Sequence, residues 1–385
     1  MEPVEESRYY WKGEPVLHKP LKRDNGKEPT VVEIFSGLGG LSMGFEMAGF
    51  KTVLGVDIHA PAVETFRKSH RNAFAILGDI KKILPEPFDN WDENLMAKAL
   101  KNIKVDVLVA GVPCQGFSLC NRKRHIADDR NYLFLYVMEC VKHIKPKYVL
   151  IENVSGLKSM NKGTFVKDIK CAIKDAGDGE DYEIETKTLN AAWFGVPQRR
   201  ERIFFMGATK NHSVKWPDES EYFPSNRYRT VRDAIGDLPP LSNRQEKTKY
   251  KLSLSETTNE YQRLMRGVEQ VLKNHIAPNH PDSTVKKIAG TRPGQPIYPK
   301  FKQRIRLSWD LPSPTQVSGG IRPQFQFGHP RDKRGLSVRE RCRIQSIPDR
   351  VEIFGGVVQG RVQTGNAVPP LMAKAIADEL IEELK

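Results

Sequence analysis

The sequence predicts an α/β protein with a doubly wound, mixed and mostly parallel sheet and a smaller irregular domain inserted before the C-terminal helix. Two observations predict this fold class. Short apolar runs of strand type alternate with helical segments in the first half of the 385 residues, and this rhythm is lost from about residue 210 until a helical pattern returns near the C-terminus. Strands that alternate with helices need crossover connections, which produce a parallel sheet.

The individual strands are predicted from β-branched and apolar runs, and the helices from the segments between them. Polar residues 1–29 form an N-terminal arm or an extra strand, and the first domain covers residues 30–210. Predicted strands cover residues 31–35, 52–58, 74–80, 105–112, 147–154, 182–189 and 202–208. Predicted helices cover residues 41–50, 61–70, 93–100, 132–144, 338–347 and 370–384, and Pro61 suits a first helical turn.

The net charge of +14 is confined to one stretch of the chain. Residues 196–345 hold 29 basic and 14 acidic residues, whereas residues 1–195 hold 28 and 27 and residues 346–385 hold 4 and 6. A basic region on a neutral scaffold favours a nucleic-acid-binding protein. The alternative is a solubilising surface, although such surfaces usually mix both signs of charge.

Composition excludes several classes of protein. No apolar run approaches the roughly 20 residues of a membrane helix, and the N-terminus is too polar for a signal peptide. Five cysteines without a C-x-x-C pair argue against a disulfide framework or a metal site and for a reducing compartment. Inert packing is expected for four of them: Cys120, Cys140, Cys171 and Cys342.

A glycine-rich turn and two acids predict a cofactor site at the edge of the sheet. Gly37, Gly39 and Gly40 follow the first strand, where they allow a tight turn against a ligand. Asp57 ends the second strand and can hold a ribose diol, and Asp79 ends the third and can accept from an adenine amino group. These residues indicate an adenosine-containing cofactor, unless they are only tight turns and solvated strand ends.

Candidate catalytic residues follow the next two strands. Cys114 comes after Pro113 at the same sheet edge, and a thiol beside a cofactor is a candidate nucleophile. The following strand ends in Glu152 and Asn153, which would face the same pocket. A strand-end glutamate can also be merely solvated.

The segment GVPQRRERIFF places further polar groups near this edge. Alternation puts Gln198, Arg200 and Arg202 on one face and Arg199 and Glu201 on the other. Two arginines and an amide suit a phosphate and a keto oxygen. The alternative is a basic strand edge paired with Glu201.

The ordered set of motifs resembles the cytosine-5 DNA methyltransferases of the prokaryotic restriction–modification type. The matching segments are FSGLGG, the acid at Asp57, GDI, PCQGFS, ENV, QRRER, RLSWDLPSPT, VRERCRIQSIPD and QTGNAVPP. They cover residues 30–210 and 305–385, and each motif alone is weak whereas their order and spacing are specific.

The resemblance implies a fold, an activity and a partner. The fold is that of S-adenosylmethionine-dependent methyltransferases, with a DNA-recognition domain at residues 211–336, target recognition at about 212–304, and a segment 337–385 that returns to the catalytic domain. The activity is DNA (cytosine-5-)-methyltransferase: base flipping exposes a cytosine in a specific double-stranded sequence, Cys114 adds to carbon 6, and carbon 5 is methylated from S-adenosylmethionine, leaving S-adenosylhomocysteine.

The resemblance also implies roles for individual residues. Glu152 supports charge at ring nitrogen 3 with Asn153 beside it, Arg202 contacts the 2-keto oxygen, and Arg200 holds the target nucleotide. The implied cofactor residues are Phe35, Gly37, Leu38, Gly40, Asp57, Ile58, Asp79, Ile80, Pro113, Leu133, Asn366 and Val368. The implied DNA-binding residues are Gln115, Ser118, Gln198 and Arg130, the last within a closing loop at 121–131.

Three alternatives and several expectations about partners accompany this interpretation. An RNA (tRNA) cytosine-5 methyltransferase would usually carry a Cys-Phe-Thr tripeptide, which this sequence lacks. A catalytically inactive DNA-binding relative would have lost catalytic positions, and a nucleotide-dependent oxidoreductase would not explain PCQGFS and ENV. We expect a monomeric, cytoplasmic, nucleoid-associated enzyme without metal or membrane, with a cognate restriction endonuclease acting separately.

Overall fold

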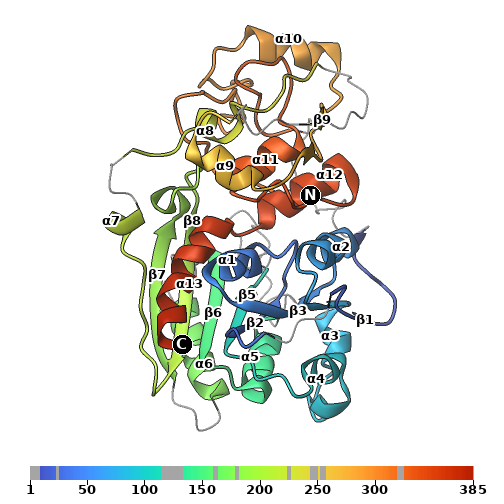
Figure 1. The fold of residues 1–385 in the computed structure, drawn as a ribbon, viewed down its shortest axis with the longest axis vertical. Helices are drawn as coiled ribbons and strands as arrows, with labels where there is room; N and C mark the ends of the chain where they lie inside the picture. The colour runs from blue at the N-terminus through green and yellow to red at the C-terminus, as the bar shows by residue number, and fades with distance from the viewer. Residues whose placement is uncertain are drawn as a thin grey trace. The chain divides into compact units, whose positions relative to one another are not determined.

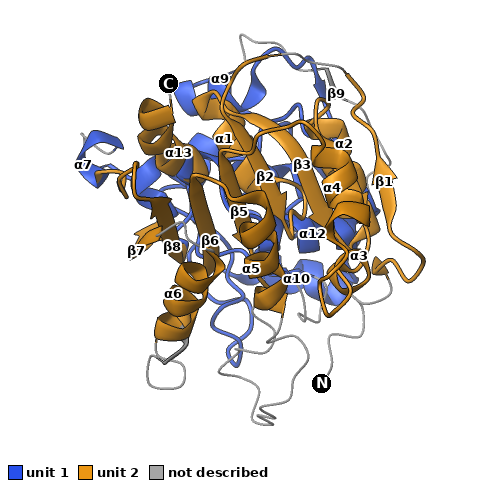
Figure 2. Ribbon diagram, turned by 90° about the horizontal axis from the view of Figure 1, so that it is seen from below, with its two compact units in different colours: residues 1–8, 191–200, 219–372 blue, residues 9–190, 201–218, 373–385 orange. Residues whose placement is uncertain are grey.

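Two compact units make up the chain in a computed structural model (Figure 2). Unit 1 contains residues 191–200 and 219–372, and unit 2 contains residues 9–190, 201–218 and 373–385. The structure describes residues 9–22, 26–113, 133–158, 164–177, 182–222, 227–242, 250–251, 257–318 and 325–384.

Unit 2 is built on a mixed, mostly parallel sheet of eight strands in the order β1-β4-β3-β2-β5-β6-β8-β7 (Figure 1). The strands are β1 Val16–His18, β2 Thr30–Ile34, β3 Lys51–Asp57, β4 Phe74–Leu77, β5 Val107–Gly111, β6 Tyr148–Val154, β7 Tyr182–Asn190 and β8 Glu201–Thr209. Strands β4, β3, β2, β5 and β6 pair in parallel, and β1, β8 and β7 join them antiparallel. The predicted fold class is confirmed for this domain.

Helices cover both faces of the sheet (Figure 2). They are α1 Gly40–Ala48, α2 Ala60–Ser69, α3 Ile80–Ile83, α4 Leu95–Leu100, α5 Leu133–Ile144, α6 Thr164–Ala176 and α13 Pro370–Leu384, with a short 3-10 turn at Trp91–Glu93. A second 3-10 turn, Ala191–Phe194, belongs to unit 1. Helix α1 ends against α13, because Gly49 lies where an added Cβ would be 3.1 Å from Ile381 Cδ1. Apolar residues of β2, β3, β5, β6 and β8 join those of α4 and α5 in one core, as expected for strands buried on both faces.

The register brings the strand ends of unit 2 to one edge. Ile34 at the end of β2 pairs with Val56 of β3 and with Ala110 of β5. Gly111, the last residue of β5, pairs with Glu152 of β6. In open α/β sheets ligands bind beyond this carboxyl edge.

Two predicted elements differ in detail. The third strand ends at Leu77 rather than at residue 80, because Asp79 caps helix α3 and its Oδ1 accepts the Lys81 N–H at 3.0 Å. Within the arm, Val16–His18 forms an extra strand that pairs with β4.

Unit 1 is made of short elements around its own apolar core. They are α7 Glu219–Tyr222, α8 Val231–Ile235, β9 Tyr250–Lys251, α9 Glu260–Arg266, β10 Val271–Leu272, α10 Asp282–Gly290, α11 Val338–Ile344 and α12 Gly356–Asn366. The core includes Val231, Tyr261, Leu307, Phe327 and Ile344.

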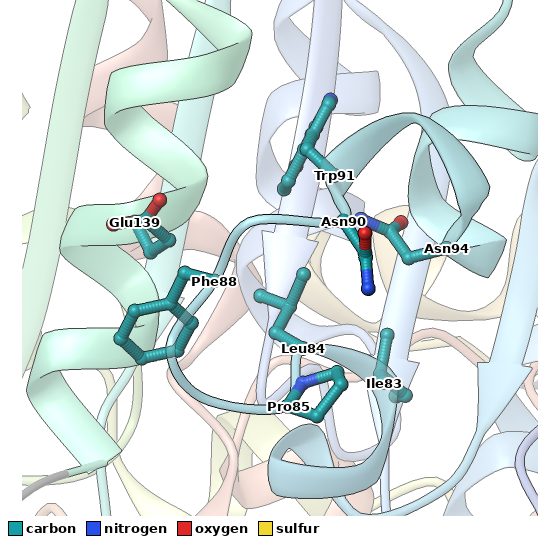
Figure 3. A pocket seen from close by; sticks show the side chains of 8 residues that line it. All are labelled: Ile83, Leu84, Pro85, Phe88, Asn90, Trp91, Asn94 and Glu139. Atoms are coloured by element: carbon teal, nitrogen blue, oxygen red, sulfur yellow. The ribbon is translucent and has the colours of Figure 1, made fainter.

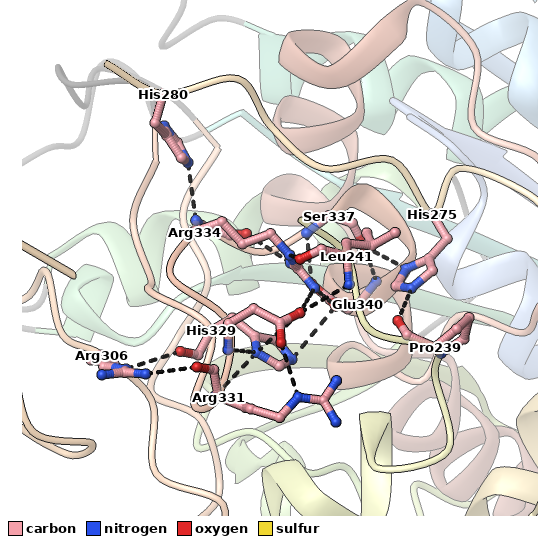
Figure 4. A network of polar contacts seen from close by, with 12 residues as sticks. Pro239, Leu241, His275, His280, Arg306, His329, Arg331, Arg334, Ser337 and Glu340 are labelled. Carbon is pink, nitrogen blue, oxygen red and sulfur yellow. Dashed lines mark hydrogen bonds and ion pairs between the residues drawn. The ribbon is translucent and has the colours of Figure 1, made fainter. Parts of the chain in front are cut away.

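A buried polar network lies beside this core (Figure 4). Glu340 accepts from Arg334 through both oxygens, at 2.7 and 2.8 Å, and from the Ser337 N–H at 2.7 Å. Ser337 caps α11 in return by accepting the Glu340 N–H at 3.1 Å. Burial alone would raise the pKa of Glu340, but Arg334 and His329 hold it below its usual range.

About a quarter of the basic residues in 196–345 are therefore buried inside unit 1 rather than available on its surface. Seven of the described arginines in that stretch are buried: Arg200, Arg266, Arg304, Arg334, Arg339, Arg341 and Arg343. Arg343, for example, donates to both oxygens of Asp349 at 2.7 and 2.6 Å. Charge counting alone therefore overestimates the surface charge available to a nucleic acid.

The C-terminal part of the chain is divided between the two units. Residues 337–372 group with unit 1, and only residues 373–385 group with unit 2. The reason is visible in α11, where Arg341 donates to Thr364 Oγ1 at 2.9 Å and to the Val317 carbonyl at 3.1 Å.

We predict that Glu340→Gln lowers the free energy of unfolding by about 3 kcal/mol, because it removes one of the two carboxylates paired with the buried Arg334 and leaves only Asp332, at 2.7 Å. Denaturant unfolding would measure the loss. The control is Glu352→Gln, whose exposed ion pair with Lys273 spans 3.4 Å and contributes less than about 1 kcal/mol. Equal effects of the two substitutions would contradict the role of the network.

Candidate active site

The turn after β2 forms the floor of the candidate site at the carboxyl edge of the sheet. Phe35, Gly37 and Gly39 have φ angles of 58, 53 and 89°. The Gly39 N–H closes the turn on the Ser36 carbonyl at 2.8 Å, and α1 begins at Gly40. Leu38 is buried beneath the turn.

Two glycines of this turn have different surroundings. A Cβ on Gly39 would lie 2.2 Å from Nε2 of His70 and 2.8 Å from Phe66, whereas a Cβ on Gly37 would meet no described atom within 4 Å. His70 is buried, contacts Phe66 with ring centroids 4.5 Å apart, and bonds Glu46 through Nδ1 at 2.7 Å. The imidazole therefore supports the turn at Gly39, whereas no described residue occupies the space beside Gly37.

Asp57 holds the turn from the neighbouring strand. Its Oδ2 accepts the Gly37 N–H at 2.8 Å and its Oδ1 accepts the His59 N–H at 2.8 Å. Burial raises the pKa of Asp57, and the two backbone hydrogen bonds oppose that rise. A carboxylate oxygen accepts more than one hydrogen bond, so Asp57 can hold the glycine turn and a ligand hydroxyl together.

The other predicted cofactor residues of unit 2 lie around the same strand ends. Ile58 follows β3, and Ile80 is buried at the start of α3 beside its cap, Asp79. Pro113 is two residues beyond the end of β5, and Leu133 begins α5. The chain order of the strands brings these residues to the edge that the sequence predicted.

Glu33 is a buried carboxyl group that the sequence analysis did not select. It lies inside β2, and its Oε2 accepts the Ser42 N–H at 2.9 Å. Burial raises the pKa of Glu33 to about 7. Hydrogen bonds from Ser42 and the charge of the nearby His70 oppose that rise. The signal in the sequence was one acid inside an otherwise apolar strand.

Glu152 and Arg202 form an ion pair at the end of β6. Arg202 Nε lies 2.7 Å from Glu152 Oε1, and both side chains are largely buried. Glu152 Oε2 is 3.7 Å from where a Cβ on Gly111 would lie. The Glu152 carboxyl group and the Arg202 guanidinium therefore meet beside Gly111, the last residue of the neighbouring strand β5. Gly111 lies three residues before Cys114 in the sequence.

Asn153 holds the backbone around this pair. Its Nδ2 donates to the Val112 carbonyl at 3.4 Å, and its Oδ1 accepts the Val154 N–H at 2.8 Å. The side chain is buried. Asn153 thus links the ends of β5 and β6 and faces the backbone rather than open space.

Four predicted site residues lie outside the described residues: Cys114, Gln115, Ser118 and Arg130. Of the expected packing cysteines, Cys120 is also outside them. Cys140 and Cys342 are buried, and burial raises the pKa of Cys342 to about 11, as expected for inert thiols. Cys171 is exposed, so inert packing is wrong for that residue.

Gln198 and Arg200 belong to unit 1, where both are fully buried. Arg200 donates to the carbonyls of Gln316 at 2.9 Å and Gly365 at 2.8 Å. Gln198 bonds the side chain of Gln345 and accepts the Gln316 N–H at 2.9 Å. The predicted alternation holds, because Arg199 and Glu201 are exposed, but the structure gives Gln198 and Arg200 internal backbone partners.

The two remaining cofactor candidates also belong to unit 1. Asn366 ends α12 and Val368 is buried shortly after it. Unit 1 also has an open groove of about 390 Å³ that the sequence analysis did not identify. It is lined by Arg199, Arg227, Tyr228, Thr230, Arg232, Asp233, Asp310, Leu311 and Pro312.

A small cavity in unit 2 is not a nucleotide site (Figure 3). Its volume of about 10 Å³ is close to that of one water molecule. It is lined by Ile83, Leu84, Pro85, Phe88, Asn90, Trp91, Asn94 and Glu139. Among the described residues, no three His, Cys, Asp or Glu side chains gather as metal ligands, and no described helix is both long and apolar enough to span a bilayer.

Comparison with known proteins identifies relatives along nearly the whole chain. Residues 29–382 match the family described as C-5 cytosine-specific DNA methylase. The type II methyltransferase M1.HphI of Haemophilus parahaemolyticus is 33% identical over 365 residues, covering 92% of this chain and 87% of the relative. M.Eco47II of Escherichia coli is 32% identical over 371 residues, covering 92% and 79%.

Solved structures share the fold. A crystal structure described as a prophage-encoded DNA modification methyltransferase (E. coli) has a TM-score of 0.74 at 24% identity, covering 92% of this chain and 99% of that one. The Dnmt2 methyltransferase of S. pombe has a TM-score of 0.55 at 16% identity, covering 92% and 98%.

The glycine turn yields a prediction with a matched pair of substitutions. Gly39→Ala should lower the free energy of unfolding by about 2–4 kcal/mol, because it adds a clash to an unfavourable φ. Gly37→Ala should cost only about 1 kcal/mol but should weaken S-adenosylmethionine binding roughly tenfold or more. Denaturant unfolding and titration calorimetry measure the two effects. Unchanged cofactor affinity in a folded Gly37→Ala protein would show that the ligand does not approach this face.

Proposed function

Because the chain belongs to the C-5 cytosine-specific DNA methylase family, we propose that it methylates a flipped-out cytosine through a covalent adduct with Cys114. It is a DNA (cytosine-5-)-methyltransferase of the restriction–modification type. The observation that carries the proposed mechanism is the Glu152–Arg202 pair, 2.7 Å apart, at the strand end beside the segment that leads into Cys114. An acid paired with a cation at this strand end supports the proposal, because a cytosine ring bound by a thiol needs both.

Cys114 is the proposed nucleophile because carbon 5 of cytosine does not attack a methyl donor unaided. The Cys114 thiolate forms a bond to carbon 6, and the electron pair of the 5,6 double bond becomes available at carbon 5. After carbon 5 has been methylated, its proton is removed, the double bond re-forms and the thiolate leaves. The base has to leave the helix first, at a cost of a few kcal/mol.

Glu152 and Arg202 are proposed to manage the charge on the ring. Addition of the thiolate places negative charge on the pyrimidine. Glu152, once it has taken up a proton on one oxygen, donates a hydrogen bond to ring nitrogen 3 and disperses that charge, while its other oxygen keeps the contact with Arg202. Arg202 orients Glu152 through the ion pair and offers its remaining N–H groups to the 2-keto oxygen. Asn153 is a positioning residue in this scheme, because its amide bonds the backbone at Val112 and Val154.

S-adenosylmethionine is the proposed cofactor, and it supplies an electrophilic methyl group on a sulfonium sulfur. The residues of unit 2 fit it: the Gly37 side of the turn has room for a ligand, and Asp57 carries a carboxylate at the sheet edge. Phe35 offers apolar surface for adenine, Asp79 offers an acceptor, and the buried Ile80 holds the start of helix α3 beside them. The roles assigned to Asn366, Val368, Arg200 and Gln198 stay predictions.

The proposed partner is double-stranded DNA, and it is read by unit 1. The groove beside Arg199, Arg227 and Arg232 has the donors that phosphate oxygens need. Gln115, Ser118 and Arg130 are proposed to contact the DNA beside the flipped base. We also propose a monomer that acts in the cytoplasm on nucleoid DNA, with a separate restriction endonuclease of the same specificity.

The Cys114 proposal is tested by covalent trapping. Duplex DNA with 5-fluorocytosine at the target position should hold the wild-type protein in a complex that survives denaturing gel electrophoresis, because fluorine cannot leave as a proton does. Cys114→Ala should abolish both trapping and methylation while S-adenosylmethionine binding persists. Bisulfite sequencing of cellular DNA first identifies the target, and a complex still trapped by Cys114→Ala would overturn the assignment.

Glu152 is tested through the rate of a single turnover. Glu152→Gln should slow methyl transfer roughly 100-fold, as expected for loss of a positioned acid, with little change in DNA affinity. Glu201→Gln is the control, since this glutamate is exposed and one residue from Arg202. A normal rate in Glu152→Gln would overturn the proposed role of Glu152 at ring nitrogen 3 and leave it only its structural contact with Arg202.

A further inference from the structure

Residues 294–306 of unit 1 form a hairpin around an antiparallel bridge between Pro296 and Ile305. The Gly294 N–H donates to the Arg306 carbonyl at 2.6 Å, and the Ile297 N–H donates to the Arg304 carbonyl at 2.8 Å. At the tip, Phe301 N–H bonds the Tyr298 carbonyl at 3.0 Å and Arg304 N–H bonds the Phe301 carbonyl at 2.9 Å. Successive tight turns therefore define the position of Phe301.

The base of the 294–306 hairpin is anchored firmly. Arg306 donates to the carbonyls of Arg331 at 2.9 Å and His329 at 3.2 Å (Figure 4), and also to the Thr291 carbonyl at 2.9 Å. Ile297 packs with Ile288 of α10 in a small apolar cluster. The tip is thus carried by a rigid support rather than by a free loop.

Arg304 supports the tip by stacking. Its guanidinium carbon lies 4.8 Å from the Phe301 ring centroid and 5.7 Å from that of Tyr298. The side chain is only 5% exposed, and its Nε and one terminal nitrogen have no hydrogen-bond partner among the described residues. Arg304 therefore forgoes hydrogen bonds for two aromatic faces, an arrangement that fixes the orientation of Phe301.

The outer side of the tip combines an aromatic ring with cations. Residues 299–303 are all exposed, and Phe301 is 45% exposed between Lys300 and Lys302. An exposed phenyl ring contributes no burial of apolar surface to the stability of the fold. Nucleic acid can bind the ring and the lysines together. The faces of its bases can pack against Phe301, and the neighbouring phosphates can pair with Lys300 and Lys302.

We propose that the 294–306 hairpin enters the target DNA, with Phe301 against a base and Lys300 and Lys302 on the flanking phosphates. Arg304 is a positioning residue that holds the Phe301 ring. This inference rests on the proposed DNA methyltransferase function and adds to it a specific contact element within unit 1. Its ligand is double-stranded DNA, and its contact is of the stacking or wedge type rather than a hydrogen-bonded base readout.

The first experiment compares two hydrophobic truncations. Phe301→Ala should weaken binding to the duplex found by bisulfite sequencing roughly 5- to 100-fold, with an unchanged dependence of affinity on salt. Leu264→Ala is the matched control, because Leu264 is 46% exposed on α9, and it should bind as the wild type does. Phe301→Leu keeps an apolar side chain and should lose less DNA affinity than Phe301→Ala. It replaces the alanine variant in the test if that variant does not fold.

The second experiment separates the cations and the stacked arginine. Lys300→Gln with Lys302→Gln should reduce the log–log salt slope by up to about 2, since each phosphate contact contributes about 0.9. Arg304→Lys keeps the charge but loses the planar stacking group, so it should weaken DNA binding in the wild-type background and have little further effect in Phe301→Ala. Thermal unfolding and S-adenosylmethionine affinity should stay at wild-type values in all variants.

The outcomes distinguish this inference from the function on which it rests. Phe301→Ala that binds DNA as Leu264→Ala does, in a protein that still methylates, would overturn the hairpin proposal alone. A wild-type protein that neither binds nor methylates DNA would overturn the proposed function instead. Additive effects of Arg304→Lys and Phe301→Ala would refute the positioning role of Arg304.

Discussion

A guanidinium that leaves water has to keep acceptors for its N–H groups, and this requirement organises unit 1. Helix α11 contributes three arginines that are fully or almost fully buried, and each reaches a different part of the unit. Arg339 bonds the carbonyls of Lys273 and Val351, Arg341 bonds Thr364, and Arg343 bonds Asp349. Because the backbone of unit 1 has few regular hydrogen-bonded ladders, these side chains tie its short elements together where a sheet would otherwise do so.

Unit 2 could be predicted from the sequence because its strands and helices alternate regularly along the chain. Strands buried on both faces appear as apolar runs, and their carboxyl ends meet at one edge whatever the connecting helices are. Asp57, Asp79 and Glu152 could therefore be assigned to one edge before their contacts were known. The turn at Gly37 and Gly39 was detectable for the same reason, but the buried His70 beneath it was not, since its partner Glu46 lies 24 residues away.

Unit 1 could not be predicted in the same way, because its charged residues do not follow the rule that charge faces water. All residues of α11 are buried, including four charged ones, so a segment that appears solvent-exposed is part of the core. Helix α12 has no apolar stripe that would reveal it. Arg200 and Gln198 match motif positions, but a motif does not specify whether a buried guanidinium bonds a backbone carbonyl or a ligand.

Unfolding exposes the seven buried arginines together with the buried carboxylates of Glu340 and Asp349 that pair with two of them. It separates the arginines from their internal partners and returns them to water, where phosphate is an available partner. A polyanion that binds the unfolded chain shifts the folding equilibrium toward it by mass action. Nucleic acid thus has two opposed relations to this enzyme, as the substrate of the folded state and as a competitor for the chain that has still to fold.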